Sequence, residues 1–468
     1  MSFVDLLKPI FKFIPEVQTP AEKPSLNSKL KWTGLVLLVF FILGQIKVLG
    51  LSAANAAEFS RLQVLLASSI GTLLTTGIGP IVVASIILQL LIGSGILKID
   101  FSTPEGRVIY SNLQKILGVL LAFFEAYIFV SVGMLEPLPG MFFLVVLQVA
   151  AGSIILMYLD EVVQKYGIGS GISLFIAGGV ASSIMWRVFS PISPTGSGLQ
   201  FFATGAGFDI ANPSGLLWIF FNQMGSNFLN AFIQNILPIL FAVIIFLIVV
   251  YFEGIHVNVP LTLGRAGQFG RFPVKFLYVS NIPVILSVAL FANISLIYSL
   301  VKDSAIPVLT PVLSYISHFT TAPYGLIENI LLQGGFAGYW GQILQGFVYI
   351  ILLMLCCVFF GKMWVQMANQ DSASVAQQLQ KSGMFLPGFR RDPRVIKTVL
   401  DRYIPTITIL GALFVGFLAG FASLTGAVGT GMGILLTVDI VYRFYETLAK
   451  EQVQDHRVLS KLMAGMKR

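Results

Sequence analysis

Apolar stretches of about 20 residues recur along almost the whole chain, and they decide what it can fold into. A helix needs about 20 mostly apolar residues to cross the hydrocarbon of a bilayer. Only 11% of the 468 residues are charged, whereas soluble domains carry roughly a quarter. The pattern therefore predicts an all-α polytopic membrane protein with ten spans. They lie at 32–50, 72–93, 108–133, 141–160, 168–189, 231–252, 275–300, 343–366, 404–423 and 431–449.

The distribution of basic residues tests this number of spans. Ten spans place both termini on one side of the membrane, and lysine and arginine accumulate on the cytosolic side. Of the 29 basic residues, only Lys47, Arg61, Arg187 and Lys302 fall on the opposite side. We therefore expect cytosolic N- and C-termini. The net charge of +8 follows from this topology and does not require DNA binding.

The spans divide into two sets of five, at 32–189 and 231–449, separated by an extracytoplasmic loop at 190–230. Five helices per half give the halves opposite orientation, as in inverted-repeat transport proteins. Residues 1–31 and 450–468 are then a cytosolic N-terminal segment and a cytosolic tail.

Two spans are interrupted by glycine, in GIGP (77–80) and GIGSG (167–171). Broken helices at membrane depth are tolerated where they line a watery cavity or are buried in protein. Close helix packing alone also explains glycine in lipid. Both interpretations stay open on the residues alone.

Enzymatic chemistry is not indicated by the sequence. No G-x-x-x-x-G-K-[ST] motif is present, and the three histidines are too scattered for a metal site. No catalytic residue, metal or other cofactor is predicted.

Three connecting segments are longer or more polar than simple turns. Two of them, 253–272 and 366–403, are basic, which fits either topology-setting charge or docking of a polyanionic partner. The third, 51–69, fits a short helix that folds back from outside or a helix on the external surface.

A dozen collinear stretches resemble the SecY family, the alpha subunit of the Sec translocon, in its archaeal and eukaryotic branch. The resemblance runs from about residue 7 to the C-terminus. The stretches are KWTG (31–34), IGTL (70–73), GIGPIV (77–82), YLDE (158–161), KYGIGSGI (165–172), YVSNIPVI (278–285), FANI (291–294), PYG (323–325), GFR (388–390), RYIP (402–405), FVGFLA (414–419) and LLTV (435–438).

The resemblance implies an hourglass-shaped channel between the two five-helix halves, closed at mid-membrane by a ring of apolar side chains. The ring would consist of Ile78, Val82, Ile172, Ile176, Ile285 and Leu436. Two of these pairs have i, i+4 spacing, which places each pair on one helix face.

The resemblance also implies a plug within about 52–69 and a lateral gate between helices 2/3 and 7/8. The plug would include Ala54, Asn55, Glu58, Phe59, Arg61 and Leu62. Glu125 and Asn293 would lie near the gate, although Glu125 could instead reach water near a helix end. Val83 replaces a polar residue that many relatives have, and no role is assigned to Asp439.

The two basic loops would be a docking surface for the ribosome. Its residues would be Arg265, Arg271, Lys275, Arg390, Arg391 and Arg394. Further implied partners are a SecE-like (gamma) subunit, a small beta subunit, nascent chains, signal sequences and the lipid bilayer. The implied location is the cell membrane of an archaeon.

Two rival functions differ in what they require at mid-membrane. An inverted-repeat secondary transporter would use acids such as Glu125 and Asp439 to couple ions. An intramembrane enzyme needs a nucleophile–base or metal constellation, which is missing. Because the expected central positions are aliphatic, we favour a channel for unfolded polypeptide that releases apolar segments sideways into lipid.

Overall fold

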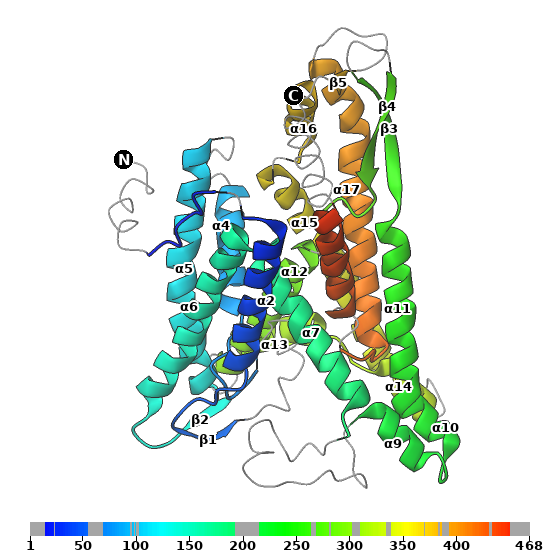
Figure 1. Ribbon diagram of the computed structural model, residues 1–468. Coiled ribbons are helices and arrows are strands. Elements are labelled where there is room, and N and C mark those ends of the chain that lie inside the picture. Colours follow the sequence, from blue (N-terminus) through cyan, green and yellow to red (C-terminus); the bar gives the residue numbers. More distant parts are fainter. Residues whose placement is uncertain are drawn as a thin grey trace. The chain divides into compact units, whose positions relative to one another are not determined.

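Long helices make up most of the structure, a computed structural model, and two small sheets accompany them (Figure 1). The residues that it describes are 15–22, 24–54, 69–93, 96, 97, 99, 103–191, 215–263, 268–279, 282–301, 309–333, 338–368, 370–381, 384–385, 393–429 and 433–449.

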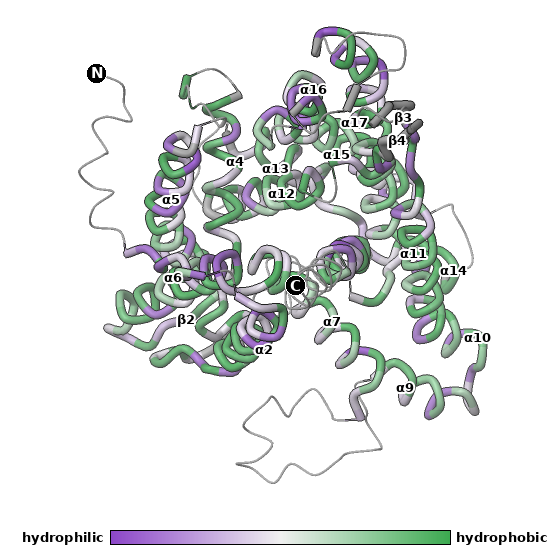
Figure 2. The backbone as a smooth tube through the Cα atoms, turned by 45° about the horizontal axis from the view of Figure 1, so that its top comes forward, coloured by the Kyte–Doolittle hydropathy of each residue, from purple (hydrophilic) through white to green (hydrophobic). Residues whose placement is uncertain are grey.

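Among these residues, eight helices are long and apolar enough to cross a membrane. Seven of them are α2 (Leu26–Leu43), α5 (Pro104–Ser131), α6 (Phe142–Tyr166), α7 (Gly171–Phe189), α12 (Ile282–Val301), α15 (Trp340–Met367) and α17 (Pro393–Leu424). The eighth joins α10 (Phe228–Ala231), the π-helical turn η1 (Phe232–Ile236) and α11 (Leu237–Glu253). Apolar residues follow one another along most of α11 (Figure 2).

The remaining two predicted spans correspond to shorter helices. The second is α4 (Gly79–Gly93), and the tenth is a helix at 433–449. α17 begins well before the predicted start of the ninth span at 404, because its first turns are amphipathic. Ile396 and Leu400 are buried there, whereas Arg394, Lys397, Asp401 and Arg402 lower the mean hydropathy of these turns.

The chain divides into two compact units. The first contains residues 1–81, 115–228 and 436–468. In its described part, α2 packs against α6 and α7, and Phe40 stacks on Phe175 with ring centroids 4.9 Å apart. Two short strands, β1 (Leu51–Ala54) and β2 (Leu135–Pro137), pair antiparallel. Helix α9 (Leu216–Gln223) contacts α7.

The second unit contains residues 82–114 and 229–435. Within it, α15 packs against α12 and α17. Two helices, α13 (Leu309–Thr320) and α14 (Leu326–Gln333), occupy the connection between α12 and α15. The Tyr324 hydroxyl, between them, donates hydrogen bonds to the carbonyls of Gly426 (3.0 Å) and Ala427 (3.1 Å).

The residues before α4, at 69–78, are irregular and yet largely buried. Their backbone is paired from two directions: the Leu73 amide donates to the Ile46 carbonyl (3.0 Å), and the Ser153 hydroxyl donates to the Gly77 carbonyl (3.1 Å). The hydroxyls of Thr76 and Ser153 are also hydrogen-bonded to each other. Since buried backbone groups must be paired, these contacts allow an irregular segment to lie buried inside the protein.

Gly152 on α6 makes the close approach of this segment possible. A Cβ atom at Gly152 would lie 1.8 Å from the Leu73 carbonyl oxygen, a backbone atom. We therefore expect Gly152→Ala to displace the segment 69–78 and to cost about 1–3 kcal/mol of stability. Thermal unfolding of the purified protein in detergent measures this loss.

Gly34→Ala is the matched control, because a Cβ atom at Gly34 on α2 would have no atom within 4 Å. This variant should unfold at the wild-type temperature or slightly above it, since alanine favours helix over glycine. Equal unfolding temperatures for the two variants would contradict the packing argument.

Candidate functional site

Four of the six predicted ring residues belong to the first unit. Ile172 and Ile176 lie on the first two turns of α7, where Ile176 is fully buried and Ile172 is half-buried. Leu436, on the helix 433–449, is also buried. Ile78 is buried and lies one residue before α4, and its carbonyl accepts a hydrogen bond from the Ile81 amide (3.1 Å).

The other two ring residues belong to the second unit. Val82 is buried in the first turn of α4, and Ile285 is half-buried in the first turn of α12. None of the six is exposed, whereas apolar residues on the outer faces of helices, such as Ile42 on α2, are exposed. Four of the six are buried, and Ile172 and Ile285 are half-buried.

A buried carboxylate holds the start of α7. The Asp160 side chain, on α6, is 7% exposed and accepts a hydrogen bond from the Ile172 amide at Oδ1 (3.0 Å). Oδ1 also accepts from the Ser170 hydroxyl (3.3 Å), and Oδ2 accepts from the side-chain amide Nε2 of Gln164 (2.8 Å). This contact joins α6 directly to a predicted ring residue.

The neighbouring Glu161 forms an ion-pair network. Its Oε1 atom lies 3.0 Å from Lys115 Nζ on α5 and 2.8 Å from Lys165 Nζ on α6. The side chains of Lys115 and Glu161 are only 9% and 11% exposed. No role for Asp160 or Glu161 was predicted from the sequence. The sequence feature that could have indicated them is a pair of adjacent acids at the end of an apolar span.

The two predicted gate residues differ in their hydrogen bonding. Glu125 on α5 is 3% exposed, and within the described part of the chain its Oε1 atom has no hydrogen-bond partner. Asn293 on α12 is half-buried, and its side-chain amide donates to the Ala289 carbonyl of the same helix (2.8 Å). The two residues belong to different units.

Most of the predicted plug lies outside the described residues. Asn55, Glu58, Phe59, Arg61 and Leu62 fall in the gap between 54 and 69. Ala54, at the end of β1, pairs with Leu135 of β2.

The two basic loops are joined by a three-stranded antiparallel sheet. The first loop forms a hairpin of β3 (His256–Leu263) and β4 (Gln268–Lys275). The second loop adds β5 (Met384–Phe385), which pairs with the end of β3, so that the strand order is β4-β3-β5 (Figure 1). Segments more than 100 residues apart in sequence therefore form one surface.

The sheet rests on an apolar core shared with the helices around it. Val274 of β4 is buried together with Leu379 of α16 (Ser372–Lys381) and Leu400 of α17. The Tyr278 hydroxyl donates to the Gln370 carbonyl (2.7 Å). This core holds both loops against the ends of the long helices.

The predicted docking residues follow this sheet. Arg271 pairs with Pro260 in the β3–β4 ladder, Lys275 pairs with His256 at the base, and Arg394 is exposed at the start of α17. Arg265, Arg390 and Arg391 lie outside the described residues.

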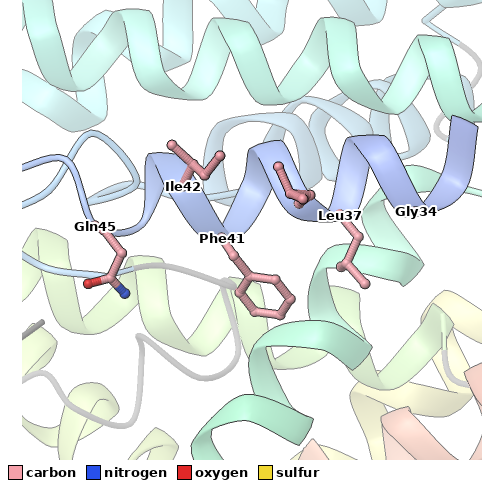
Figure 3. Close-up of a pocket in the computed structure, with 6 residues that line it drawn as sticks. Gly34, Leu37, Phe41, Ile42 and Gln45 are labelled. Atoms are coloured by element: carbon pink, nitrogen blue, oxygen red, sulfur yellow. The ribbon is translucent and has the colours of Figure 1, made fainter.

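An open apolar groove runs along α2. It is lined by Gly34, Leu37, Leu38, Phe41, Ile42 and Gln45. Figure 3 shows Phe41 and Gln45 pointing to one side of the helix and Ile42 to the other. Gln45 is the one polar side chain in this lining, so the groove has no set of polar groups that could carry out a reaction. No group of three or more potential metal ligands occurs among the described residues.

Comparison with known proteins gives one consistent family. The SecY family model matches residues 72–445. The protein translocase subunit SecY of Methanocaldococcus jannaschii is 43% identical over 465 residues, which cover 98% of this chain and 99% of the relative.

Two solved structures extend the similarity to the fold. "The structure of a protein conducting channel" has a TM-score of 0.81 and 42% identity, and the match covers 96% of this chain and 97% of that one. "Sec61 in the Canine ribosome-channel complex from the endoplasmic reticulum" has a TM-score of 0.78 and 41% identity, with the same coverage.

The buried network around Glu161 should contribute strongly to stability. We expect Glu161→Gln to cost roughly 3 kcal/mol, because it leaves the buried Lys115 cation without its carboxylate. Thermal unfolding in detergent is the measurement.

Asp401→Asn provides the control. It removes a pair of the same kind, Lys397–Asp401 at 3.1 Å, whose side chains are 50% and 45% exposed. Exposed i, i+4 pairs contribute about 0.5 kcal/mol or less. A loss for Asp401→Asn as large as that for Glu161→Gln would show that burial is not the deciding factor.

Proposed function

This chain belongs to the SecY family of protein translocase subunits, and we propose that the six aliphatic residues of the predicted ring close its pore. As a member of that family it is the protein-conducting subunit of the Sec translocon, a multi-pass membrane protein that performs no enzymatic reaction. The secondary-transporter alternative is thereby set aside.

The observation that carries the ring proposal is the burial of aliphatic side chains at these positions. Val82, Ile176 and Leu436 are buried on helices and Ile78 is buried one residue before α4, whereas large apolar residues elsewhere, such as Met185 on α7, are exposed. A narrow aliphatic constriction loses water and offers ions no ligands. Branched side chains can still part around an extended polypeptide, so one ring serves as both seal and passage.

The plug and the gate complete the proposed channel. Residues 52–69 form a plug that closes the extracytoplasmic side, and apolar segments leave between helices 2/3 and 7/8. The buried Glu125 supports a polar position near this gate, because an acid within a span is costly and usually functional. Asn293 is assigned to the same gate on the strength of the family resemblance.

The three-stranded sheet is the proposed docking surface for the ribosome. It brings the two basic loops together, and a relative of 41% identity occurs in a ribosome–channel complex. Arg265, Arg271, Lys275, Arg390, Arg391 and Arg394 would pair with phosphates of ribosomal RNA. A SecE-like subunit and a small beta subunit complete the proposed complex.

The proposed location is the cell membrane of an archaeon, with both termini in the cytosol. The archaeal sources of the similar translocase subunits and the distribution of basic residues support it. The two five-helix halves, 32–189 and 231–449, then have opposite orientations.

The ring proposal predicts a leak when the seal is weakened. Replacing Ile78, Ile172 and Ile285 together by serine should raise the ion conductance of the resting channel, because hydroxyl groups retain water in the constriction. Planar-bilayer recording of the reconstituted complex measures this conductance.

Three isoleucines on outer helix faces serve as the control for this experiment. Ile42, Ile155 and Ile351 are exposed, and their replacement by serine should leave the resting channel closed. Unchanged conductance in the ring variant would count against the ring.

The docking proposal predicts a salt-dependent loss of affinity. Reversing the charge of Arg265, Arg271 and Arg390 should weaken ribosome binding and reduce the slope of log affinity against log salt by about three. Co-sedimentation with ribosomes at several salt concentrations provides the measurement.

Reversal of three cations elsewhere on the same proposed side is the control. Lys29, Lys31 and Arg107 lie outside the sheet and its loops. If their reversal weakened binding as much, general charge rather than a defined surface would explain the effect.

A further inference from the structure

The turn between α6 and α7 is held by side chains from two neighbouring helices. The amides in the first turn of a helix lack partners within the helix and need capping. Ser170 occupies the N-cap position of α7, but its side chain makes no capping bond to the helix. Asp160 supplies the bond instead, from α6, and the amide that it accepts belongs to Ile172 itself.

Close backbone contact reinforces this cap. A Cβ atom at Gly171 would lie 2.5 Å from the Asp160 Cα atom. The start of α7 therefore lies directly against α6, with no side chain between them. The negative charge of the carboxylate at a helix N-terminus is favourable because of the helix dipole.

α2 fixes the same turn from another direction. The Thr33 hydroxyl accepts a hydrogen bond from the Ile168 amide (3.1 Å) and donates to the Lys29 carbonyl (2.9 Å). The ring centroids of Trp32 and Tyr166 lie 5.4 Å apart. Asp160 of α6 and Thr33 of α2 are thus the two side chains that hold the turn, and Asp160 is the one that caps the first turn of α7 itself.

We propose that Asp160 is a positioning residue that sets the resting height of Ile172 and Ile176 by capping α7. The proposal rests on the ring proposed above. Asp160 touches no transported chain and acts only through the first turn of α7. Without this acceptor, the amide of the half-buried Ile172 needs another partner, and a shift of the turn to reach one carries the isoleucines with it.

The test compares three variants of the complete complex in planar bilayers. Asp160→Ala removes the acceptor and should raise the resting ion conductance about fivefold or more, as expected when the capped amide loses its partner. Asp160→Asn keeps an oxygen acceptor of the same length and should stay near wild type. Glu161→Gln weakens the adjacent network without touching α7 and should not leak.

The pattern of leaks separates positioning from stability. The inference is overturned if Glu161→Gln leaks as much as Asp160→Ala at equal loss of thermal stability. It is also overturned if the Asp160→Asn channel does not stay closed. Should Asp160→Ala fold poorly, Gly171→Ala tests the same contact, because its Cβ atom would meet the Asp160 backbone. A tight Gly171→Ala channel would likewise overturn the inference.

The ring variants distinguish failure of the seal itself from failure of the positioning role of Asp160. If the serine variant of Ile78, Ile172 and Ile285 leaks while Asp160→Ala stays closed, the ring stands and the positioning role fails. If the serine variant stays closed, the ring itself fails, and the positioning role has no seal to act on.

Discussion

The structure depends on hydrogen-bond partners for the buried backbone groups at the places where the chain interrupts its own helices. The segment 69–78 could not remain irregular at this depth without Ser153 and the threonines around it. Gly152 gives it the room to approach α6. Hydrogen-bond pairing, more than hydrophobic burial, therefore determines where α4 begins, since apolar surface is already satisfied by lipid.

The same rule governs the start of α7. Its first amides are capped by Asp160 from another helix, and the turn before it is capped by Thr33. Both glycine-rich breaks in the sequence thus correspond to places where one helix presents polar atoms to the end of another. At these two breaks, close packing and proximity to the proposed ring are both present, so the two interpretations of the glycines are compatible.

The sequence predicted the membrane class and most of the spans, because apolar length and basic asymmetry are strong signals. It did not predict the sheet. A two-residue strand such as β5 has no period to detect, and its partner β3 lies more than 100 residues away. Asp160 was missed for a similar reason: a cap supplied by another helix leaves no trace in local spacing. The amphipathic start of α17 was missed because its charges lower the hydropathy.

The distance between β3 and β5 along the chain has a consequence for biosynthesis. Phe385 is made about 120 residues after Leu263, which at ribosomal speeds of 5–20 residues per second is a delay of roughly 6–24 s. During that interval the hairpin has an unpaired edge, and a two-stranded ribbon is only marginally stable by itself. The proposed docking surface is therefore completed only after most of the polypeptide has been synthesised.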